Sequence, residues 1–185
     1  MRESSETELK YLVESDEALE RFQSELSGFE GERQQENIYL DQAGILRAKG
    51  CLFRIRIENG EGVVTLKMSG GLVSGVGRAV EFSEDLDSDS LRFIHQGDFI
   101  QALSGHSCIE KAEAGCEVPL KSLSEWGRIQ NQRRRDRLEG GWLIEVDRSR
   151  YPGGEIRREI ELESEDPQAA RQVIEPFFEK SAVEW

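Results

Sequence analysis

Hydrophobic and polar residues alternate in short blocks along the chain, and these blocks predict a mixture of strands and helices. A period of two predicts strands near residues 6–13, 36–40, 51–58, 63–68, 78–83, 126–137, 142–150 and 155–163. Apolar spacings of three and four predict helices over 16–27 after the N-cap Ser15, over 87–105 with a break at Gly97, and from Asp166-Pro167 to about Lys180. The segment 106–124 is predicted to be helical in part. Because the strands are too close together in sequence for parallel crossovers, we expect an antiparallel α+β fold.

Nearly every predicted strand has one ionised face and one apolar face. Side chains i and i+2 share a face, which groups Glu6, Glu8 and Lys10; Arg54 and Arg56; Thr65 and Lys67; Asn131, Arg133 and Arg135; Glu145 and Asp147; and Glu159, Glu161 and Glu163. One interpretation is an ordinary sheet with its polar side in water. The other is a curved or closed sheet, because the apolar stripes of the helices need the apolar strand faces to cover. In that case the ionised faces converge inside and need compensating ions.

Charge along the chain is sorted by sign. The 185 residues carry 37 Asp and Glu against 24 Lys and Arg, a net charge of −13, which excludes a surface that is basic throughout and binds nucleic acid. Two short segments are nevertheless basic: residues 47–67, with 5 bases and 2 acids, and residues 128–137, with 5 Arg and one Asp. Arginine makes up 18 of the 24 bases, which suits phosphate binding but is also expected from a GC-rich genome.

No repeat or Pro-rich linker divides the sequence, so we expect one domain over residues 1–185. The absence of a run of ~18 apolar residues and of a signal peptide predicts a cytoplasmic protein without a membrane partner. Cys51, Cys108 and Cys116 are odd in number and form no CxxC pair, which argues against a disulfide framework or zinc site. The Ser, Cys and His residues show no triad-like arrangement. His95 and His106 are interpreted as surface or core residues.

Several carboxylates beside several Arg and Lys side chains suggest a specific chemistry. Carboxylates are the ligands that Mg²⁺ and Mn²⁺ prefer, and Mg²⁺ commonly binds carboxylates together with substrate phosphates. Arg and Lys side chains would hold the phosphate charge. The combination therefore indicates a metal–polyphosphate site.

Seven short motifs, in order along residues 6–163, resemble those of the CYTH superfamily, the triphosphate tunnel metalloenzymes. Glu6-Thr7-Glu8-Leu9-Lys10 resembles the ExExK signature that opens the domain. The other resemblances are Gln35 to Asp41 (Q-x-N-x-Y-F-D), Phe53 to Arg56 (L-R-x-R), Thr65 to Lys67 (T-L-K), Arg78 to Glu81, Arg133 before Val146-Asp147, and Glu159 to Glu163 (E-x-E-x-E). Each motif is short, but their common order is specific.

The resemblance implies an eight-stranded antiparallel barrel that forms a tunnel, with helices outside. It implies metal ligation by Glu6, Glu8, Glu159 and Glu161, assisted by Asp147 and by Glu81 or Glu163, and it makes Glu6, Glu8, Lys10, Glu159 and Glu161 the catalytic group. It implies triphosphate binding by Lys10, Arg54, Arg56, Lys67 and Arg133, with Arg78 and Arg135 as weaker candidates.

The expected activity is Mg²⁺- or Mn²⁺-dependent hydrolysis of a triphosphate, with inorganic tripolyphosphate as the leading substrate. Thiamine triphosphatase, adenylyl cyclase and a non-catalytic polyphosphate- or nucleotide-binding module remain open. We expect no nucleic-acid partner, and a homodimer stays open because small barrels with exposed edges often pair. Many relatives have a C-terminal Ser-Lys pair, for which this sequence offers only Lys180-Ser181.

Overall fold

The computed structural model describes residues 1–73, 76–117 and 119–183. Its strands are β1 (Arg2–Leu12), β2 (Phe29–Asp41), β3 (Cys51–Glu58), β4 (Glu61–Val73), β5 (Val76–Leu86), β6 (Ser124–Arg137), β7 (Leu143–Arg150) and β8 (Ile156–Glu163). Its helices are α1 (Asp16–Ser24), α2 (Ile45–Ala48), α3 (Ser88–His95), α4 (Phe99–Ala102), α5 (Ser107–Cys116) and α6 (Pro167–Ser181), and a 3₁₀ turn covers Glu139–Gly141.

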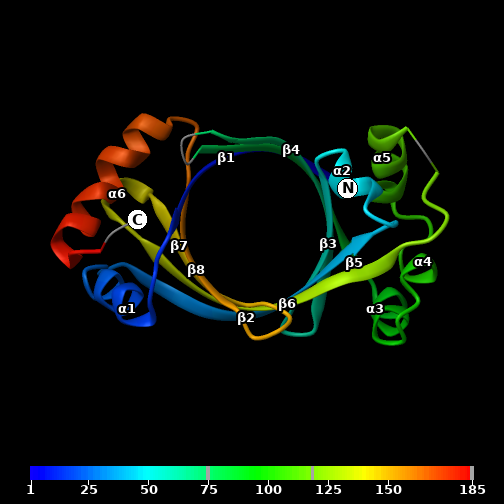
Figure 1. The fold of residues 1–185 in the computed structure, drawn as a ribbon, viewed down its shortest axis with the longest axis horizontal. Coiled ribbons are helices and arrows are strands. Elements are labelled where there is room, and N and C mark those ends of the chain that lie inside the picture. Colours follow the sequence, from blue (N-terminus) through cyan, green and yellow to red (C-terminus); the bar gives the residue numbers. More distant parts are fainter. Residues whose placement is uncertain (74–75, 118, 184–185) are drawn as a thin grey trace. The chain divides into compact units, whose positions relative to one another are not determined.

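The strands form one closed sheet (Figure 1). They are hydrogen-bonded in the order β1-β5-β4-β3-β2-β6-β7-β8, and β8 pairs with β1. The hairpin and neighbour pairs β2–β3, β3–β4, β6–β7, β7–β8 and β1–β8 are antiparallel. Within the described residues the fold therefore has eight strands in a closed barrel and six α-helices, which confirms the expected α+β barrel.

Local sequence signals account for the helix ends. The Ser15 side chain accepts a hydrogen bond of 3.1 Å from the backbone N–H of Ala18 and caps α1. Asp166 caps α6 in the same way, with Pro167 at the first helical position. The predicted helix over 87–105 is two helices, because Gly97 has a φ of +79° and Asp98 starts α4 with a new cap.

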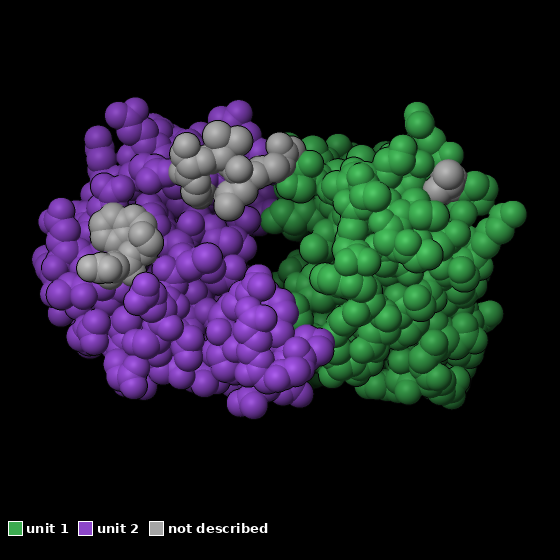
Figure 2. Space-filling view, in the orientation of Figure 1, with its two compact units in different colours: residues 1–5, 35–71, 79–129 green, residues 6–34, 72–78, 130–185 purple. Residues whose placement is uncertain are grey.

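The chain divides into two compact units, coloured separately in Figure 2. Unit 1 comprises residues 1–5, 35–71 and 79–129, and unit 2 comprises residues 6–34, 72–78 and 130–185. In unit 1, α2 to α5 pack on the apolar face of the strands in a cluster that includes Ile38, Phe53, Val64, Leu103 and Cys108. The three cysteines are free and buried in this unit.

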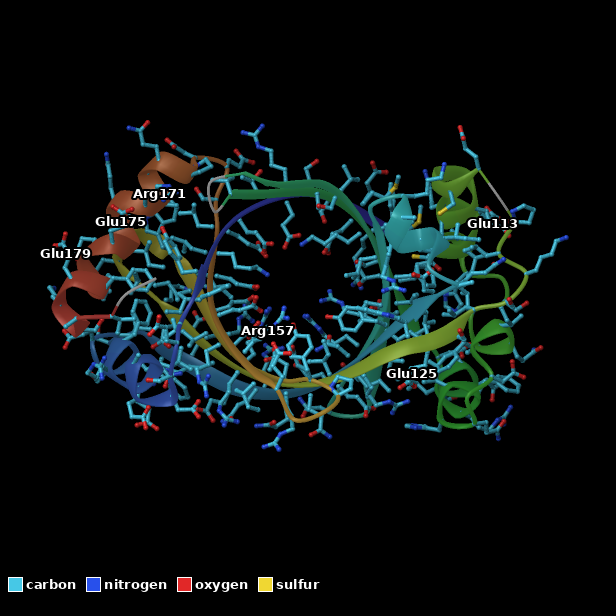
Figure 3. All side chains as sticks on the ribbon, viewed as in Figure 1. Glu113, Glu125, Arg157, Arg171, Glu175 and Glu179 are labelled. Atoms are coloured by element: carbon cyan, nitrogen blue, oxygen red, sulfur yellow. The ribbon has the colours of Figure 1, made fainter. Side chains whose placement is uncertain are left out.

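In unit 2, α1 and α6 cover the apolar face of β1, β7 and β8 (Figure 1). Phe22 and Phe178 are fully buried there, with ring centroids 4.8 Å apart. Figure 3 labels Arg171, Glu175 and Glu179 along α6. In both units the apolar strand face is thus the helix-covered face. We call the opposite face of the same strands the helix-free face, and it carries the polar side chains of each unit.

Candidate active site

The helix-free face of unit 2 gathers charged residues from β1, β6, β7 and β8. Cross-strand register places Lys10 opposite Glu161, Glu145 opposite Glu161, Asp147 opposite Glu159, Arg133 opposite Asp147, and Arg135 opposite Glu145. We call Glu8, Lys10, Arg133, Arg135, Glu145, Asp147, Glu159 and Glu161 the acid cluster. Five carboxylates thus face three cationic side chains, which leaves two negative charges in excess.

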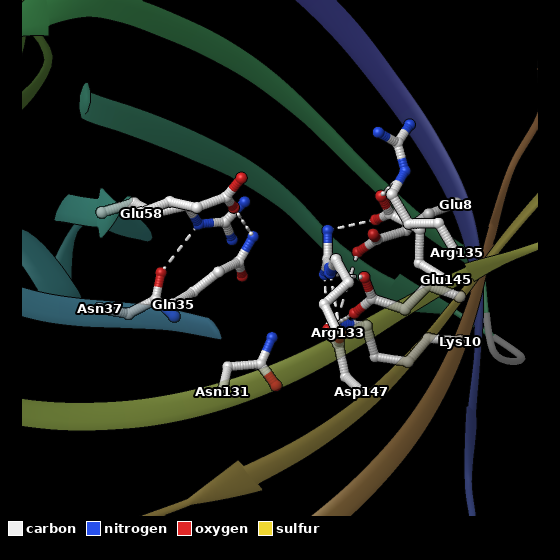
Figure 4. Close-up of polar contacts among 12 residues, drawn as sticks. Glu8, Lys10, Gln35, Asn37, Glu58, Asn131, Arg133, Arg135, Glu145 and Asp147 are labelled. Atoms are coloured by element: carbon white, nitrogen blue, oxygen red, sulfur yellow. Dashed lines mark hydrogen bonds and ion pairs between the residues drawn. The ribbon is translucent and has the colours of Figure 1, made fainter. Parts of the chain in front are cut away.

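Arg133 lies at the centre of the acid cluster and contacts three of its carboxylates (Figure 4). Its Nε donates to Asp147 Oδ1 at 2.7 Å and its Nη2 donates to Asp147 Oδ2 at 2.5 Å. Nη2 also donates to Glu161 Oε2 at 3.0 Å, and Nη1 donates to Glu145. Burial opposes the charge of Arg133, but these carboxylates outweigh burial and raise its pKa.

Lys10 is the second cation of the acid cluster. Its Nζ lies 2.5 Å from Glu161 Oε1 and 3.8 Å from Glu8 Oε1. Burial lowers the pKa of Lys10, yet Glu161, Glu159 and Glu8 together raise it above its ordinary value. Lys10 is therefore held fully protonated, so it acts as a charge rather than as an acid or base.

Two carboxyls of the acid cluster are less well compensated. Burial raises the pKa of Glu145, and the neighbouring Asp147 and Glu161 add to the shift against the opposing effect of Arg133. Burial also raises the pKa of Glu159, again with like charges nearby. Both pKa shifts follow first from burial and then from the neighbouring like charges, so a further positive charge nearby would favour the ionised carboxylates.

The helix-free face of unit 1 carries a separate set of cations from β3 and β4. Arg56 Nε donates to Asn37 Oδ1 at 2.9 Å, and Lys67 Nζ lies 3.6 Å from Glu81 Oε1. Arg54 lies opposite Tyr39 and Thr65. Its Nε is buried and has no hydrogen-bond partner among the described residues. An unsatisfied buried guanidinium N–H is costly, so this atom points to an anion that the protein alone does not provide.

Most residues predicted for the site lie on these helix-free faces. Glu8, Lys10, Arg133, Arg135, Asp147, Glu159 and Glu161 belong to the acid cluster, and Arg54, Arg56, Lys67 and Glu81 lie in unit 1. Glu6 is half-buried two residues before Glu8, and Glu163 is exposed opposite Glu8. The structure therefore brings the metal-ligand candidates Glu8, Asp147, Glu159 and Glu161 together in one unit, without Glu81.

Arg78 is not brought to the same face as the other candidates. It is exposed near the start of β5, and strand alternation places it on the face of Val80 and Phe82, opposite to Glu81. Lys180 and Ser181 lie at the end of α6, where the Ser181 hydroxyl donates to the Phe177 carbonyl at 2.7 Å and Lys180 lies over the Phe177 ring. Arg78, Lys180 and Ser181 are therefore not part of the acid cluster.

Glu145 was not predicted as a site residue, although its contact with Arg133 makes it part of the acid cluster. The signal was present, because Glu145 shares a strand face with Asp147. Two buried amides were also missed as site residues: Asn37, which orients Arg56, and Asn131, which accepts a hydrogen bond from Ser149.

The expectation of no triad-like arrangement is wrong. Ser90 Oγ lies 3.4 Å from His106 Nε2, and His106 Nδ1 lies 3.0 Å from Glu84 Oε2. Glu84 also accepts the backbone N–H groups of Ser107 and Cys108 at the start of α5, both at 3.2 Å. Since Ser90 is buried and Glu84 serves the end of a helix, these contacts join β5, α3 and α5 as a structural link.

Divalent metal fits the chemistry of the acid cluster, whose donors are carboxylate oxygens. Among the described residues, however, no group of three or more His, Cys, Asp or Glu is arranged to hold a metal ion. The carboxylates instead contact Arg133 and Lys10. No helix in the described part of the chain is long and apolar enough to cross a membrane.

Comparisons with known proteins agree with this architecture. A solved structure from Hippeastrum, described as an adenylyl cyclase candidate with a dominant triphosphatase activity, has a TM-score of 0.87 at 24% identity over 96% of this chain and 88% of that chain. An adenylate cyclase candidate from Bacillus halodurans has a TM-score of 0.78 at 22% identity over 100% and 93%. A Pyrococcus horikoshii protein has a TM-score of 0.59 at 20% identity over 97% and 91%. These likenesses show the fold.

No curated protein matches the sequence. The family model of the CYTH domain, in contrast, matches residues 4–183, a range that includes every strand except the first two residues of β1. The chain therefore belongs to the CYTH domain family.

Proposed function

We propose that this protein hydrolyses a triphosphate in a reaction that depends on Mg²⁺ or Mn²⁺, with inorganic tripolyphosphate as the leading substrate. The observation that carries the proposal is the acid cluster of unit 2, where five carboxylates accompany only three cations. A protein that only bound an anion would gain nothing from such an excess of acid unless a metal joined it.

In this proposal the metal is held by Glu8, Asp147, Glu159 and Glu161, the predicted ligands that share the helix-free face of unit 2. Glu145 joins them as an added candidate. The family resemblance implies Glu6 as a further main ligand and Glu81 or Glu163 as an assisting one. When bound, the metal would neutralise phosphate charge and polarise a phosphoryl oxygen.

The candidate phosphate-binding cations are Lys10, Arg133 and Arg135 in unit 2 and Arg54, Arg56 and Lys67 in unit 1. Arg54 is the strongest of these candidates. Among the described residues, the buried Nε atoms of Arg54 and Arg135 both lack a hydrogen-bond partner, but Arg135 Nε lies 3.4 Å from the Glu145 carboxylate, whereas no ion pair is found for Arg54. A phosphate oxygen would satisfy that donor with a charge-assisted hydrogen bond. Arg78 is the weakest candidate for phosphate binding, since it is exposed on the opposite face of β5.

The proposed chemistry needs no covalent intermediate. Phosphoryl transfer depends mainly on positioning and charge stabilisation, which the Arg and Lys side chains supply without exchanging protons. A carboxylate of the acid cluster would position the attacking water, whose oxygen forms the new P–O bond as diphosphate leaves. Ser90, His106 and Glu84 take no part, because they are engaged in joining β5, α3 and α5.

Phosphate release from tripolyphosphate, thiamine triphosphate and ATP, measured side by side with Mg²⁺ and with Mn²⁺, tests the proposal and separates its substrates. We expect metal-dependent release, fastest from tripolyphosphate. A faster reaction with thiamine triphosphate, or formation of cyclic AMP from ATP, would favour the corresponding alternative. Binding of all three without any reaction would instead favour a non-catalytic module and contradict hydrolysis.

The variant Glu8→Gln refines the same test because it keeps the shape of the side chain and removes its charge. We expect turnover to be abolished while the circular dichroism spectrum is unchanged. Unchanged turnover in this variant would refute the metal-binding role of Glu8.

A further inference from the structure

The guanidinium of Arg133 is committed to carboxylates in this structure. Nε, Nη1 and Nη2 each donate to the acid cluster, and together they reach Asp147, Glu145 and Glu161 on two neighbouring strands (Figure 4). Its side chain is only 11% exposed. The arrangement differs from that of a residue waiting for phosphate, which would direct its donors away from its acidic neighbours.

Arg54 shows that contrast within the same chain. No ion pair is found for Arg54 among the described residues, and its buried Nε lacks a hydrogen-bond partner there. Arg133, in contrast, forms ion pairs with three carboxylates. The two arginines therefore have different roles in the protein without ligands, although the family resemblance predicted the same role for both.

Charge balance explains why Arg133 is placed there. The carboxylates of Glu145, Asp147 and Glu161 are all largely buried, with exposed fractions of 16%, 5% and 12%. Buried carboxylates that lie together repel one another and need a cation. Lys10 contacts Glu161 and Glu8, and Arg135 lies 3.4 Å from Glu145. Only Arg133, among the described residues, bridges Asp147 to the others.

We propose that Arg133 is the internal counter-cation of the metal-free protein: it occupies the oxygens of Asp147 and Glu161 that a divalent metal would take, and it competes with the metal for them. Arg133 thereby sets both the stability of the metal-free protein and its affinity for metal. The inference rests on the proposed function in one respect, namely that the metal binds these carboxylates. It makes Arg133 a positioning residue.

A consequence concerns the order of binding. As long as its N–H groups donate to carboxylates, Arg133 is not available to a phosphate oxygen. Release of Asp147 and Glu161 frees Nε and Nη2, which can then donate to an anion. Arg133 thus changes partners between the metal-free and the metal-loaded protein, which reconciles its observed contacts with the phosphate-binding role that the resemblance implies.

Binding of Mn²⁺ alone, followed by electron paramagnetic resonance at constant ionic strength, tests the competition without relying on activity. In Arg133→Met we expect Mn²⁺ to bind about tenfold more tightly than in the unsubstituted protein, because a competing buried charge is removed. Arg133→Lys keeps the charge and loses the planar fork, so its affinity should lie between the two. Thermal unfolding in EDTA should show a lower midpoint for Arg133→Met, and saturating Mn²⁺ should raise that midpoint more than in the unsubstituted protein.

The matched control is Arg92→Met, which makes the same substitution on α3 in unit 1. Arg92 is 58% exposed and lies 3.2 Å from the exposed Asp89. Its Mn²⁺ affinity should stay within about twofold of the unsubstituted protein, since a screened surface charge contributes little. Should Arg133→Met fold poorly, the comparison of Arg133→Lys with Arg92→Lys decides the question by the same measurement.

Two results would overturn the inference, and they are distinguishable from failure of the proposed function. Equal or weaker Mn²⁺ binding in Arg133→Met, with binding intact in the unsubstituted protein, would show that Arg133 does not compete with metal and would leave the proposed function standing. An absence of Mn²⁺ binding in every variant would contradict both.

Discussion

Arg133 and Asp147 lie directly opposite each other on β6 and β7, and their side chains form two parallel hydrogen bonds of 2.7 and 2.5 Å. Paired N–H groups of a guanidinium match the two oxygens of a carboxylate, so this geometry is strong as well as specific. The side chains are 11% and 5% exposed, which protects the pair from the screening that weakens surface ion pairs. Asp147 therefore stabilises the fold through its pair with Arg133, and it is also a proposed metal ligand.

Removal of the Asp147 charge should destabilise the metal-free protein. Asp147→Asn is expected to lower the free energy of unfolding by about 1–3 kcal/mol, because Arg133 loses a buried charged acceptor but keeps Glu145 and Glu161. Urea denaturation in EDTA measures the effect. The control Glu155→Gln breaks the exposed pair with Arg157 and should change stability by less than about 0.5 kcal/mol. Equal losses in the two variants would contradict the account.

Arg54 should matter for the substrate and not for the fold. Arg54→Met is expected to lower kcat/KM for tripolyphosphate by about 10–100-fold, because a charge-assisted contact to phosphate is lost. Stability should change by less than about 1 kcal/mol, since no ion pair among the described residues is broken and an unsatisfied donor is removed. Steady-state kinetics and thermal unfolding check the two effects. Arg92→Met, on the exposed side of α3, is the control, and matching kinetics in both variants would refute the role of Arg54.

Asp16 should give the protein a measurable acid dependence. Hydrogen bonds from Arg158 and Arg148 hold the pKa of Asp16 well below its usual value of 3.8. A depressed pKa stabilises the folded protein above the unfolded value of 3.8, and this contribution disappears as the pH falls toward the folded pKa. Because Asp16 is 39% exposed, solvent screening reduces the effect, and we expect Asp16→Asn to cost about 1 kcal/mol at pH 7.

The difference between Asp16→Asn and the unsubstituted protein should therefore shrink as the pH falls below 3.8. Guanidinium denaturation at a series of pH values measures it. Asp89→Asn, an exposed residue in the first turn of α3, serves as the control and should show a smaller difference at pH 7. A difference for Asp16→Asn that does not depend on pH would contradict the assigned pairing.

The Ser90, His106 and Glu84 contacts should be structural. Glu84→Gln is expected to lower the free energy of unfolding by about 1–2 kcal/mol, because the start of α5 loses a charged acceptor. Ser90→Ala should leave phosphate release from tripolyphosphate unchanged. Phosphate assays and chemical denaturation on both variants check these expectations. Loss of turnover in Ser90→Ala, with the fold intact, would give the serine a catalytic role that the present account excludes.

Much of the fold could be predicted from local sequence, and the exceptions have physical causes. Caps such as Ser15 and Asp166 are local signals, so the starts of α1 and α6 were predicted correctly. The first part of β2 was missed, because residues 29–34 carry no apolar alternation. Their strand conformation depends on a partner elsewhere in the chain: the Arg137 N–H donates to the Gly28 carbonyl at 2.7 Å, and Arg137 pairs with Glu30.

The candidate site, like the fold, could be predicted only in part. Alternation along single strands correctly predicted that Glu8 and Lys10 share a face of β1. It also correctly predicted that Arg133 and Arg135 share a face of β6. It could not predict which acid would pair with Arg133, because that depends on the register between β6, β7 and β8. The link from Ser90 to His106 was unpredictable for the same reason, since its members come together only in the tertiary structure.

The most direct test of the central claim is the release of phosphate from tripolyphosphate by the unsubstituted protein, followed in EDTA and after addition of Mg²⁺ or Mn²⁺. Glu161→Gln is the matched variant, because Glu161 contacts both Lys10 and Arg133. The account predicts no release in EDTA, release of one phosphate and one diphosphate per tripolyphosphate with metal, and at least about a hundredfold slower release in Glu161→Gln. Equal rates with and without metal, or an unchanged rate in Glu161→Gln, would contradict it.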